Sequence, residues 1–147
     1  MGRFLAIDYG KKRVGIAVTD ELQIAANALD TLPPAAALDF LQRYAATHSV
    51  ELVVVGMPVN LNGQPAAAAA GAREFMLRIK KRLPNMPVEM FDERFTSKMA
   101  KQVILEAGVK KMGRRNKELI DKVSACIMLQ SYMEYRNRKS KIENPHD

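Results

Sequence analysis

Three acidic residues stand where a packed fold disfavours a charge. Asp8 ends the apolar run 4–7, Glu93 ends the run that starts at Val88, and Asp121 lies near the start of an apolar helical stretch. Two carboxylates about 4 Å apart repel each other by about 4 kcal/mol near a protein surface, so a cluster of three requires cations. Carboxylate oxygens and water are the ligands of Mg²⁺ and Mn²⁺. If the fold brings these acids together, the sequence predicts a Mg²⁺ or Mn²⁺ site.

The charge balance indicates a polyanionic partner. The 147 residues carry a net charge of +7. Residues 94–141 contain thirteen Lys or Arg and four Asp or Glu, a net charge of +9, and the remainder has −2. Two basic runs, 110–117 and 136–141, flank the helical stretch that carries Asp121. This placement favours contact with phosphates over a merely solvated surface.

Composition excludes several other classes of protein. A chain of 147 residues forms one domain with a real core, and 48% hydrophobic with 27% charged residues is typical of globular proteins. No apolar run approaches the length of a membrane span, and the first residues do not resemble a signal peptide. One cysteine and two histidines cannot build a typical zinc site, and the absence of an internal disulfide fits the cytoplasm. We therefore expect a cytoplasmic protein with no membrane association.

The order of elements predicts an α/β sandwich. Strands are expected at 3–8, 14–19, within 22–29, at 51–56 and at 87–92. Helices are expected after Pro33, over 66–83, between a cap at Thr96 and Gly108, and from a cap at Asn116 onward. Three strands followed by alternating helices and strands match the ribonuclease-H-like fold, a five-stranded mixed sheet flanked by helices. We expect a single nuclease domain over residues 1–138 and a basic, polar tail over 139–147.

Four segments in this order resemble one known family. They are IDYGKKRVGIAV, VVVGMPVNLNG, DERFTS and IDKVSACIMLQSY, and together they cover most of the chain up to about Arg136. The chain is similar to the YqgF/RuvX family of pre-16S rRNA nucleases, which is related to the RuvC Holliday junction resolvases. The resemblance implies that Asp8, Glu93 and Asp121 are catalytic and hold one or two Mg²⁺ or Mn²⁺ ions. RuvC-like resolvases often carry a second acid one turn after Asp121, where this chain has Ser124 or Ala125.

Each assignment has a plainer alternative. Asp8 could form the turn before Gly10, and Asp121 could pair with a neighbouring lysine. Neighbouring residues on a strand point to opposite faces, so only one of Asp92 and Glu93 can share a face with Asp8. The family resemblance favours Glu93 as the metal ligand. The sequence alone leaves this choice open.

Several basic residues are candidates for contacts with nucleic acid. Arg94 could bind the scissile phosphate, although a salt bridge to Asp92 or Glu93 is the alternative. The candidates are Lys12, Arg13, Arg94, Lys98, Lys110, Lys111, Arg114 and Arg115.

The predicted function is metal-dependent hydrolysis of phosphodiester bonds, in maturation of the 5′ end of pre-16S rRNA. RNA is favoured as the substrate and structured DNA is the alternative, with ribosome precursors as partners of a monomer or weak homodimer. Two other functions stay open: a resolvase-like DNA nuclease, and a non-enzymatic nucleic-acid-binding factor in transcription or ribosome assembly. A resemblance of residues 8–10 to the phosphate loop of actin-like ATPases is weak, because those proteins need two such lobes.

Overall fold

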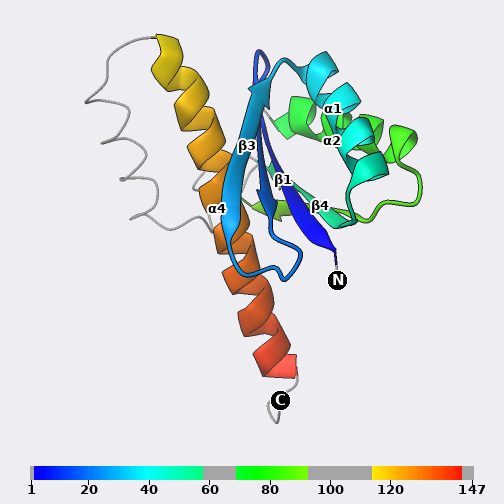
Figure 1. Ribbon diagram of the computed structural model, residues 1–147, viewed down its shortest axis with the longest axis vertical. Helices are drawn as coiled ribbons and strands as arrows, with labels where there is room; N and C mark the ends of the chain where they lie inside the picture. The colour runs from blue at the N-terminus through cyan, green and yellow to red at the C-terminus, as the bar shows by residue number, and fades with distance from the viewer. Residues whose placement is uncertain (1, 58–68, 93–113, 144–147) are drawn as a thin grey trace.

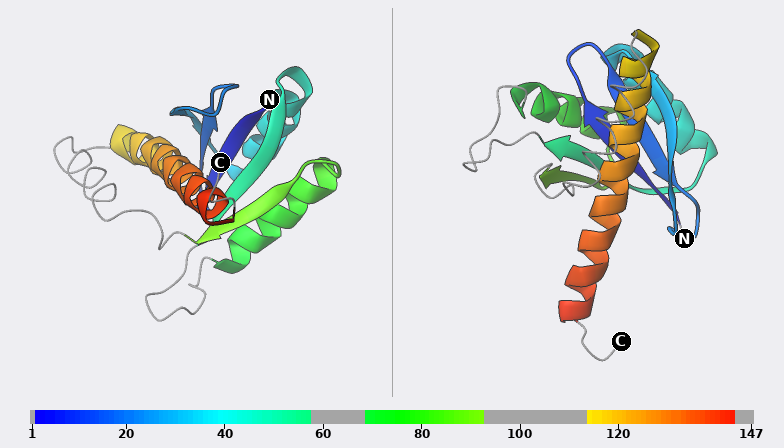
Figure 2. Two further views of the ribbon diagram at one scale, coloured as in Figure 1. Left: turned by 90° about the horizontal axis from the view of Figure 1, so that it is seen from below. Right: turned by 90° about the vertical axis from the view of Figure 1, so that its left-hand side faces the viewer.

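The computed structural model describes residues 2–57, 69–92 and 114–143, and side chains within 2–57, 69–92 and 124–139. A five-stranded sheet has helices on both of its faces (Figures 1 and 2). The strands are β1 Arg3–Tyr9, β2 Val14–Thr19, β3 Ala26–Leu32, β4 Val50–Met57 and β5 Val88–Asp92. The helices are α1 Pro34–Thr47, α2 Ala69–Arg82 and α4 Arg114–Glu143.

The sheet is mixed, with β1 at its centre. Its strand order is β3-β2-β1-β4-β5. β1 pairs antiparallel with β2 and parallel with β4, and β4 pairs parallel with β5. The strands expected at 3–8, 14–19, 51–56 and 87–92 and the ribonuclease-H-like architecture are confirmed. The carboxyl ends of β1, β4 and β5 therefore lie at the same edge of the sheet, where open α/β sheets bind ligands.

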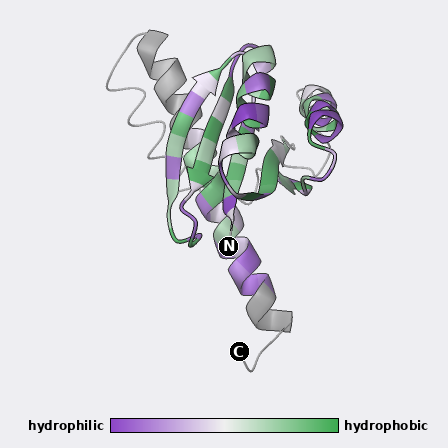
Figure 3. Ribbon diagram, turned by 45° about the vertical axis from the view of Figure 1, so that its right-hand side comes forward, coloured by the Kyte–Doolittle hydropathy of each residue, from purple (hydrophilic) through white to green (hydrophobic). Residues whose placement is uncertain are grey.

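Alternation along the strands divides the core into two layers. On one face, large aliphatic side chains such as Leu5, Ile7 and Val55 pack against α1 and α2. On the other face, Phe4, Ala6 and their neighbours pack against α4. Figure 3 shows the sheet as largely hydrophobic, whereas the lower part of α4 is polar where it extends past the strands. Residues 134–139 of this helix are all exposed, in agreement with that extension.

The helix ends mostly follow the predicted signals. Pro34 occupies the first turn of α1, where a missing N–H costs nothing, and His48 caps the carboxyl end of this helix. Basic residues occupy the last turn of α2, where they stabilise the negative end of the helix dipole. The expected helix between Thr96 and Gly108 lies outside the described residues.

Two boundaries differ from the predictions. β3 starts at Ala26, inside the expected range 22–29, but it continues to Leu32. Asp20 organises a turn before this strand: its carboxylate accepts hydrogen bonds from the N–H groups of Ile24 (2.8 Å) and Ala25 (2.9 Å). The pKa of Asp20 is lowered, and the hydrogen bond from the backbone N–H of Ala25 is the largest cause. Asn116 lies inside α4 and cannot be its N-cap.

α4 runs on through Glu143, across the predicted boundary between domain and tail at residue 138. That division stays a prediction. No helix within the described ranges combines the length and the apolarity needed to cross a membrane.

Candidate active site

Asp8 lies near the carboxyl end of the central strand, on the face that α4 covers. Phe4 and Ala6, at alternate positions before it, both belong to the α4 layer of the core. Asp8 is half-buried and its antiparallel partner is Gly15. On the parallel side, Ile7 pairs with Val55, so the next residue in that register is Gly56. Both immediate strand neighbours of Asp8 are therefore glycines, and Thr31 and Phe91 follow them in the same row on β3 and β5.

The side chains of the α4 face become smaller toward this row. Along β1 the α4-facing positions read Phe4, Ala6 and Asp8, and along β4 they read Leu52, Val54 and Gly56. β2 runs the opposite way and reads Gly15, Ala17 and Thr19 from the same row. Small residues allow the helix backbone to approach the sheet closely at this end. The row therefore fits a site where a metal ion and a substrate oxygen must approach Asp8.

α4 packs its buried stripe against this face of the sheet. Ala125, Met128 and Tyr132 are buried on the helix and belong to the same cluster as Ala6. Position 121 precedes them by one helical turn, in the series 121, 125, 128 and 132. The Asp121 side chain lies outside the described residues. The helix therefore supports the prediction by register alone.

The structure separates Asp92 from the face of Asp8. Val88 packs against the core layer of α1 and α2, whereas Phe91 is buried in the α4 layer. Because strand neighbours alternate, Asp92 shares the side of Val88. Asp92 is therefore not placed to join Asp8 on the α4 face. Glu93 lies outside the described residues, and its role as a ligand stays a prediction.

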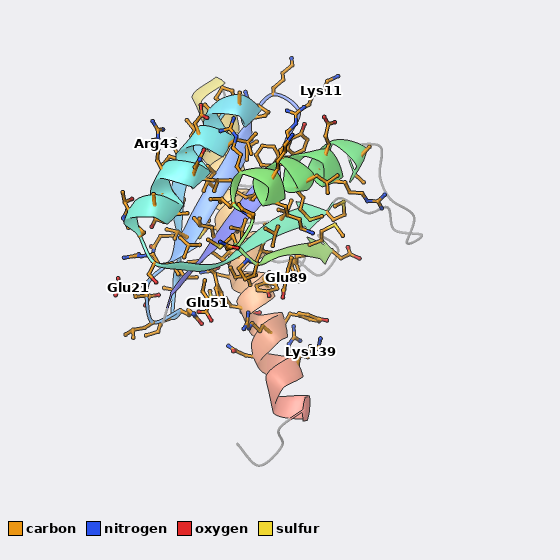
Figure 4. All side chains as sticks on the ribbon, turned by 90° about the vertical axis from the view of Figure 1, so that its right-hand side faces the viewer. Lys11, Glu21, Arg43, Glu51, Glu89 and Lys139 are labelled. Atoms are coloured by element: carbon orange, nitrogen blue, oxygen red, sulfur yellow. The ribbon has the colours of Figure 1, made fainter. Side chains whose placement is uncertain are left out.

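The turn between β1 and β2 presents the basic residues closest in sequence to Asp8. A Cβ at Gly10 would meet the carbonyl oxygen of Arg13 at 2.5 Å, so this tight turn requires a glycine. Lys11 and Lys12 are exposed and Arg13 is half-buried. Figure 4 shows Lys11 projecting from the turn, far from Glu51 at the other end of the sheet. The turn places positive charge beside the end of β1 that carries Asp8.

Tyr9 anchors this turn to α2. Its ring packs on Phe75 with centroids 5.3 Å apart. A Cβ at Gly71 would lie 2.8 Å from a ring carbon of Tyr9, so Gly71 makes room for the ring. The contact fixes the strand end immediately after Asp8. Sequence reasoning missed this role of Gly71, which only the packing of α2 on β1 reveals.

The structure does not describe the side chains of the other residues that are predicted to bind nucleic acid. Arg94, Lys98, Lys110 and Lys111 are outside the described residues, and Arg114 and Arg115 belong to the first turn of α4 without described side chains. Among the described side chains, no three His, Cys, Asp or Glu gather as a metal site. The three-carboxylate ligand set and the basic contacts therefore stay predictions.

Sequence reasoning also missed a polar link across the α4 layer. The hydroxyl of Tyr132 on α4 donates a hydrogen bond to the carboxylate of Glu89 on β5. Burial, followed by the hydrogen bond and the charge of Glu89, raises the pKa of Tyr132 to about 12. A tyrosine within an apolar helical stretch is the only sequence signal of this link. Figure 4 shows Glu89 beside α4.

Cys126 is half-buried at the edge of the same layer. Its thiol donates a hydrogen bond to the carbonyl oxygen of Ala26 (3.2 Å). Burial raises the pKa of this thiol, which disfavours the reactive thiolate. The cysteine is thus a packing residue, as its place in an apolar stretch predicts.

A mixed five-stranded sheet with a long helix laid across one face defines a ribonuclease-H-like fold. Two structures of Thermus thermophilus RuvC share this architecture. One contains a Holliday junction substrate (TM-score 0.53, 17% identity, 92% of this chain and 96% of that chain). The other has a TM-score of 0.54 at 16% identity, over 90% of this chain and 96% of that chain. At this identity the likeness shows the fold alone.

Sequence comparison identifies the family. The RuvX family, described as Holliday junction resolvase, matches residues 2–135, and the chain belongs to it. A Bacteroides fragilis protein named "Putative pre-16S rRNA nuclease" is 50% identical over 134 residues, which cover 91% of this chain and 97% of that protein. Proteins of the same name from Flavobacterium johnsoniae (50% identity, 90% of this chain, 96% of theirs) and Porphyromonas gingivalis (47%, 94% and 100%) are similarly close. The predicted family membership is confirmed.

Proposed function

We propose that this protein is a metal-dependent nuclease that hydrolyses phosphodiester bonds in precursor 16S rRNA. The observation that carries the proposal is the placement of Asp8 at the end of the central strand, in a row with Gly15 and Gly56, under the helix that carries position 121. The close relatives named for pre-16S rRNA support RNA as the substrate. The net charge of +7 supports a polyanionic ligand.

The residues present fit a hard divalent cation. Asp8 offers carboxylate oxygens, the ligand type that Mg²⁺ and Mn²⁺ prefer, and its two strand neighbours are glycines. Glu93 and Asp121 would complete the ligand set. When bound, Mg²⁺ or Mn²⁺ lowers the pKa of water and neutralises charge that develops on phosphate oxygens. The half-buried position of Asp8 limits access of bulk solvent to this carboxylate.

The protein residues supply orientation and charge. Tyr9 and Gly71 hold the strand end that carries Asp8 against α2. Lys12 and Arg13 in the adjoining turn would bind phosphates flanking the cut, together with Arg94, Lys98, Lys110, Lys111, Arg114 and Arg115. Asp92 faces away and would act at most on the neighbouring loop. No nucleophilic side chain is required, because water attacks the phosphorus.

A panel of substrates tests the proposal. Purified protein is incubated with Mg²⁺ or Mn²⁺ and, separately, with precursor 16S rRNA, unstructured RNA and four-way DNA junctions, with Asp8→Asn as the control. Cleavage of precursor rRNA near its 5′ end by the wild type, and not by Asp8→Asn, is expected. Cleavage restricted to the junction would favour the resolvase function, for which the family description is the specific observation. Binding without cleavage of any substrate would favour a non-enzymatic role.

A further inference from the structure

β5 depends on side chains for its position against α4. Among the described strands it pairs only with β4, and it lies at one end of the strand order. Within the part of the chain that the structure describes, α4 lies across β1, β2 and β3, and its backbone approaches β5 over a shorter stretch. The relation between β5 and α4 matters because the sequence places one predicted acid just after β5 and another on α4. A contact that holds β5 against α4 would therefore influence the distance between the predicted ligands Glu93 and Asp121.

Tyr132 contacts both α4-facing residues of β5. Its hydroxyl bonds to the carboxylate of Glu89. Its ring meets the edge of Phe91 with centroids 5.6 Å apart and planes at 82°. Glu89 and Phe91 are two residues apart and therefore share this face of the strand. The next position of that series is 93, which lies outside the described residues.

Tyr132 also contacts residues outside β5. Its ring also contacts Phe4 of the central strand, with centroids 6.3 Å apart. The guanidinium of Arg136 lies 4.9 Å from the centroid of the Phe4 ring and interacts with the Tyr132 hydroxyl. Tyr132 itself is only 5% exposed. The tyrosine is thus fixed by β1, β5 and its own helix at once.

The helix carries this constraint toward the site. Position 121 precedes Tyr132 by eleven residues, close to three turns, so both lie on one stripe of α4 about 16 Å apart along the axis. A shift of β5 along or away from α4 at Tyr132 would change the distance between the end of β5, which Glu93 follows in sequence, and the turn of α4 that contains position 121. Misplacement of catalytic groups by about 1 Å can cost about a hundredfold in rate.

The geometry points to Tyr132 as a positioning residue that, through its hydroxyl bond to Glu89, sets the distance between β5 and α4 and thereby assembles the metal site. This inference rests on the proposed nuclease function and deepens it. Tyr132 touches neither substrate nor metal and acts through Glu89 and Phe91. Residues that orient metal ligands from outside the ligand shell commonly change metal affinity or activity by about 10- to 100-fold.

The test removes the bond while keeping the ring. Tyr132→Phe should lower kcat on precursor rRNA by about tenfold with KM unchanged, and raise the Mn²⁺ concentration that gives half of the thermal stabilisation several-fold. Glu89→Ala should match it. Glu89→Gln should retain most activity, since an amide oxygen still accepts from the hydroxyl. The double variant Tyr132→Phe/Glu89→Ala should be no worse than either single variant, because one bond is lost only once.

Tyr44→Phe is the matched control. Tyr44 lies on α1, on the opposite face of the sheet, where it stacks on Phe40 and His48. Its loss of a hydroxyl should change neither kcat nor the Mn²⁺ midpoint. A purely structural role for Tyr132 would lower the melting temperature and leave kcat and the Mn²⁺ midpoint of the folded protein at wild-type values.

The outcomes separate this proposal from the proposed function. A wild type that cleaves and responds to Mn²⁺, with a Tyr132→Phe variant equal to it in both, overturns the positioning role alone. Fully additive losses in the double variant overturn it as well. A wild type that neither cleaves nor responds to Mn²⁺ overturns the nuclease function and this proposal together.

Discussion

The two faces of the sheet differ in the size and the polarity of their side chains. The face toward α1 and α2 is built from large aliphatic residues, among them Leu5, Ile7 and Val55, and contains no acid among its buried members. The face toward α4 tapers from Phe4 to Ala6 to Asp8 on the same central strand. One strand thus contributes packing to one layer and a carboxylate to the other. Because successive side chains of β1 point to opposite faces, the aliphatic packing residues and the carboxylate lie on different sides of the sheet.

The difference between the two faces accounts for the charge in the middle of this sheet. A half-buried carboxylate costs folding free energy unless it is paired, hydrated or bound to a cation. On the α4 face, Gly15 and Gly56 place no side chain of their own beside Asp8. The well-packed opposite face, with residues such as Leu41 almost fully buried, supplies the compensating stability.

The largest effect should follow from the single acid at the centre of the α4 face. Asp8→Asn should reduce cleavage by at least about a hundredfold, the scale for removing a group that stabilises the transition state. Nucleic-acid binding should persist or strengthen, because a charge that repels phosphate is removed. Cleavage rates and filter-binding affinities measured side by side check this, and full activity of the variant would refute the site.

Truncation of a core side chain on the face toward α1 and α2 should lower stability and leave cleavage unchanged. Leu41→Ala removes a core side chain that is 1% exposed and should cost about 2–5 kcal/mol of unfolding free energy. The cleavage rate per folded molecule should stay at the wild-type value. Urea titration gives the first quantity and single-turnover kinetics below the transition give the second. A catalytic loss in folded Leu41→Ala would show that the two faces are not independent.

Metal should stabilise the protein through the α4 face alone. At one hundred times its dissociation constant, a ligand that binds only the native state contributes about 2.7 kcal/mol. For a domain of this size that corresponds to roughly 5–10 °C in melting temperature. Asp8→Asn should raise the melting temperature of the metal-free protein and weaken the response to Mn²⁺. Equal responses in wild type and variant would place the metal elsewhere.

The basic run should affect binding without affecting either face of the core. Replacing Lys110, Lys111, Arg114 and Arg115 with Ala should reduce the dependence of log affinity on log salt by about two to three, since each single-strand phosphate contact contributes about 0.7. The melting temperature should change little. Affinities measured over a series of KCl concentrations decide the matter, and an unchanged slope would make this run a solvated surface.

Adjacent residues of β2 offer the finest test. Gly15→Ala adds a methyl group beside Asp8 and should lower cleavage several-fold, while unfolding free energy changes by less than about 1 kcal/mol. Ile16→Val on the other face should cost about 0.5–1.5 kcal/mol and leave cleavage unchanged. Equal effects of both substitutions on stability, with cleavage intact in both, would mean that Gly15 serves packing only.

Much of the fold was accessible from local patterns. Continuous apolar runs predicted β1, β2 and β4, because strands that are buried on both faces demand such residues. The third strand was expected within 22–29; it starts at Ala26, since the carboxylate of Asp20 accepts hydrogen bonds from the N–H groups just before it, and it continues to Leu32. Such a turn competes with the strand over only a few residues, and propensity cannot resolve it.

The sequence by itself determined which residues could do chemistry, because an acid that ends an apolar strand is costly to bury without a cation or a polar partner. The segments that carry the family resemblance are contiguous, so they too can be read without a structure. The tertiary structure decided which neighbours these residues have. The register between β1 and β2 pairs Gly15 with Asp8. Phe91 is buried on the α4 face, so its neighbour Asp92 lies on the opposite face from Asp8. The link from Tyr132 to Glu89 joins residues 43 apart in sequence. Contacts of this kind depend on how whole elements pack, and no local pattern encodes that information.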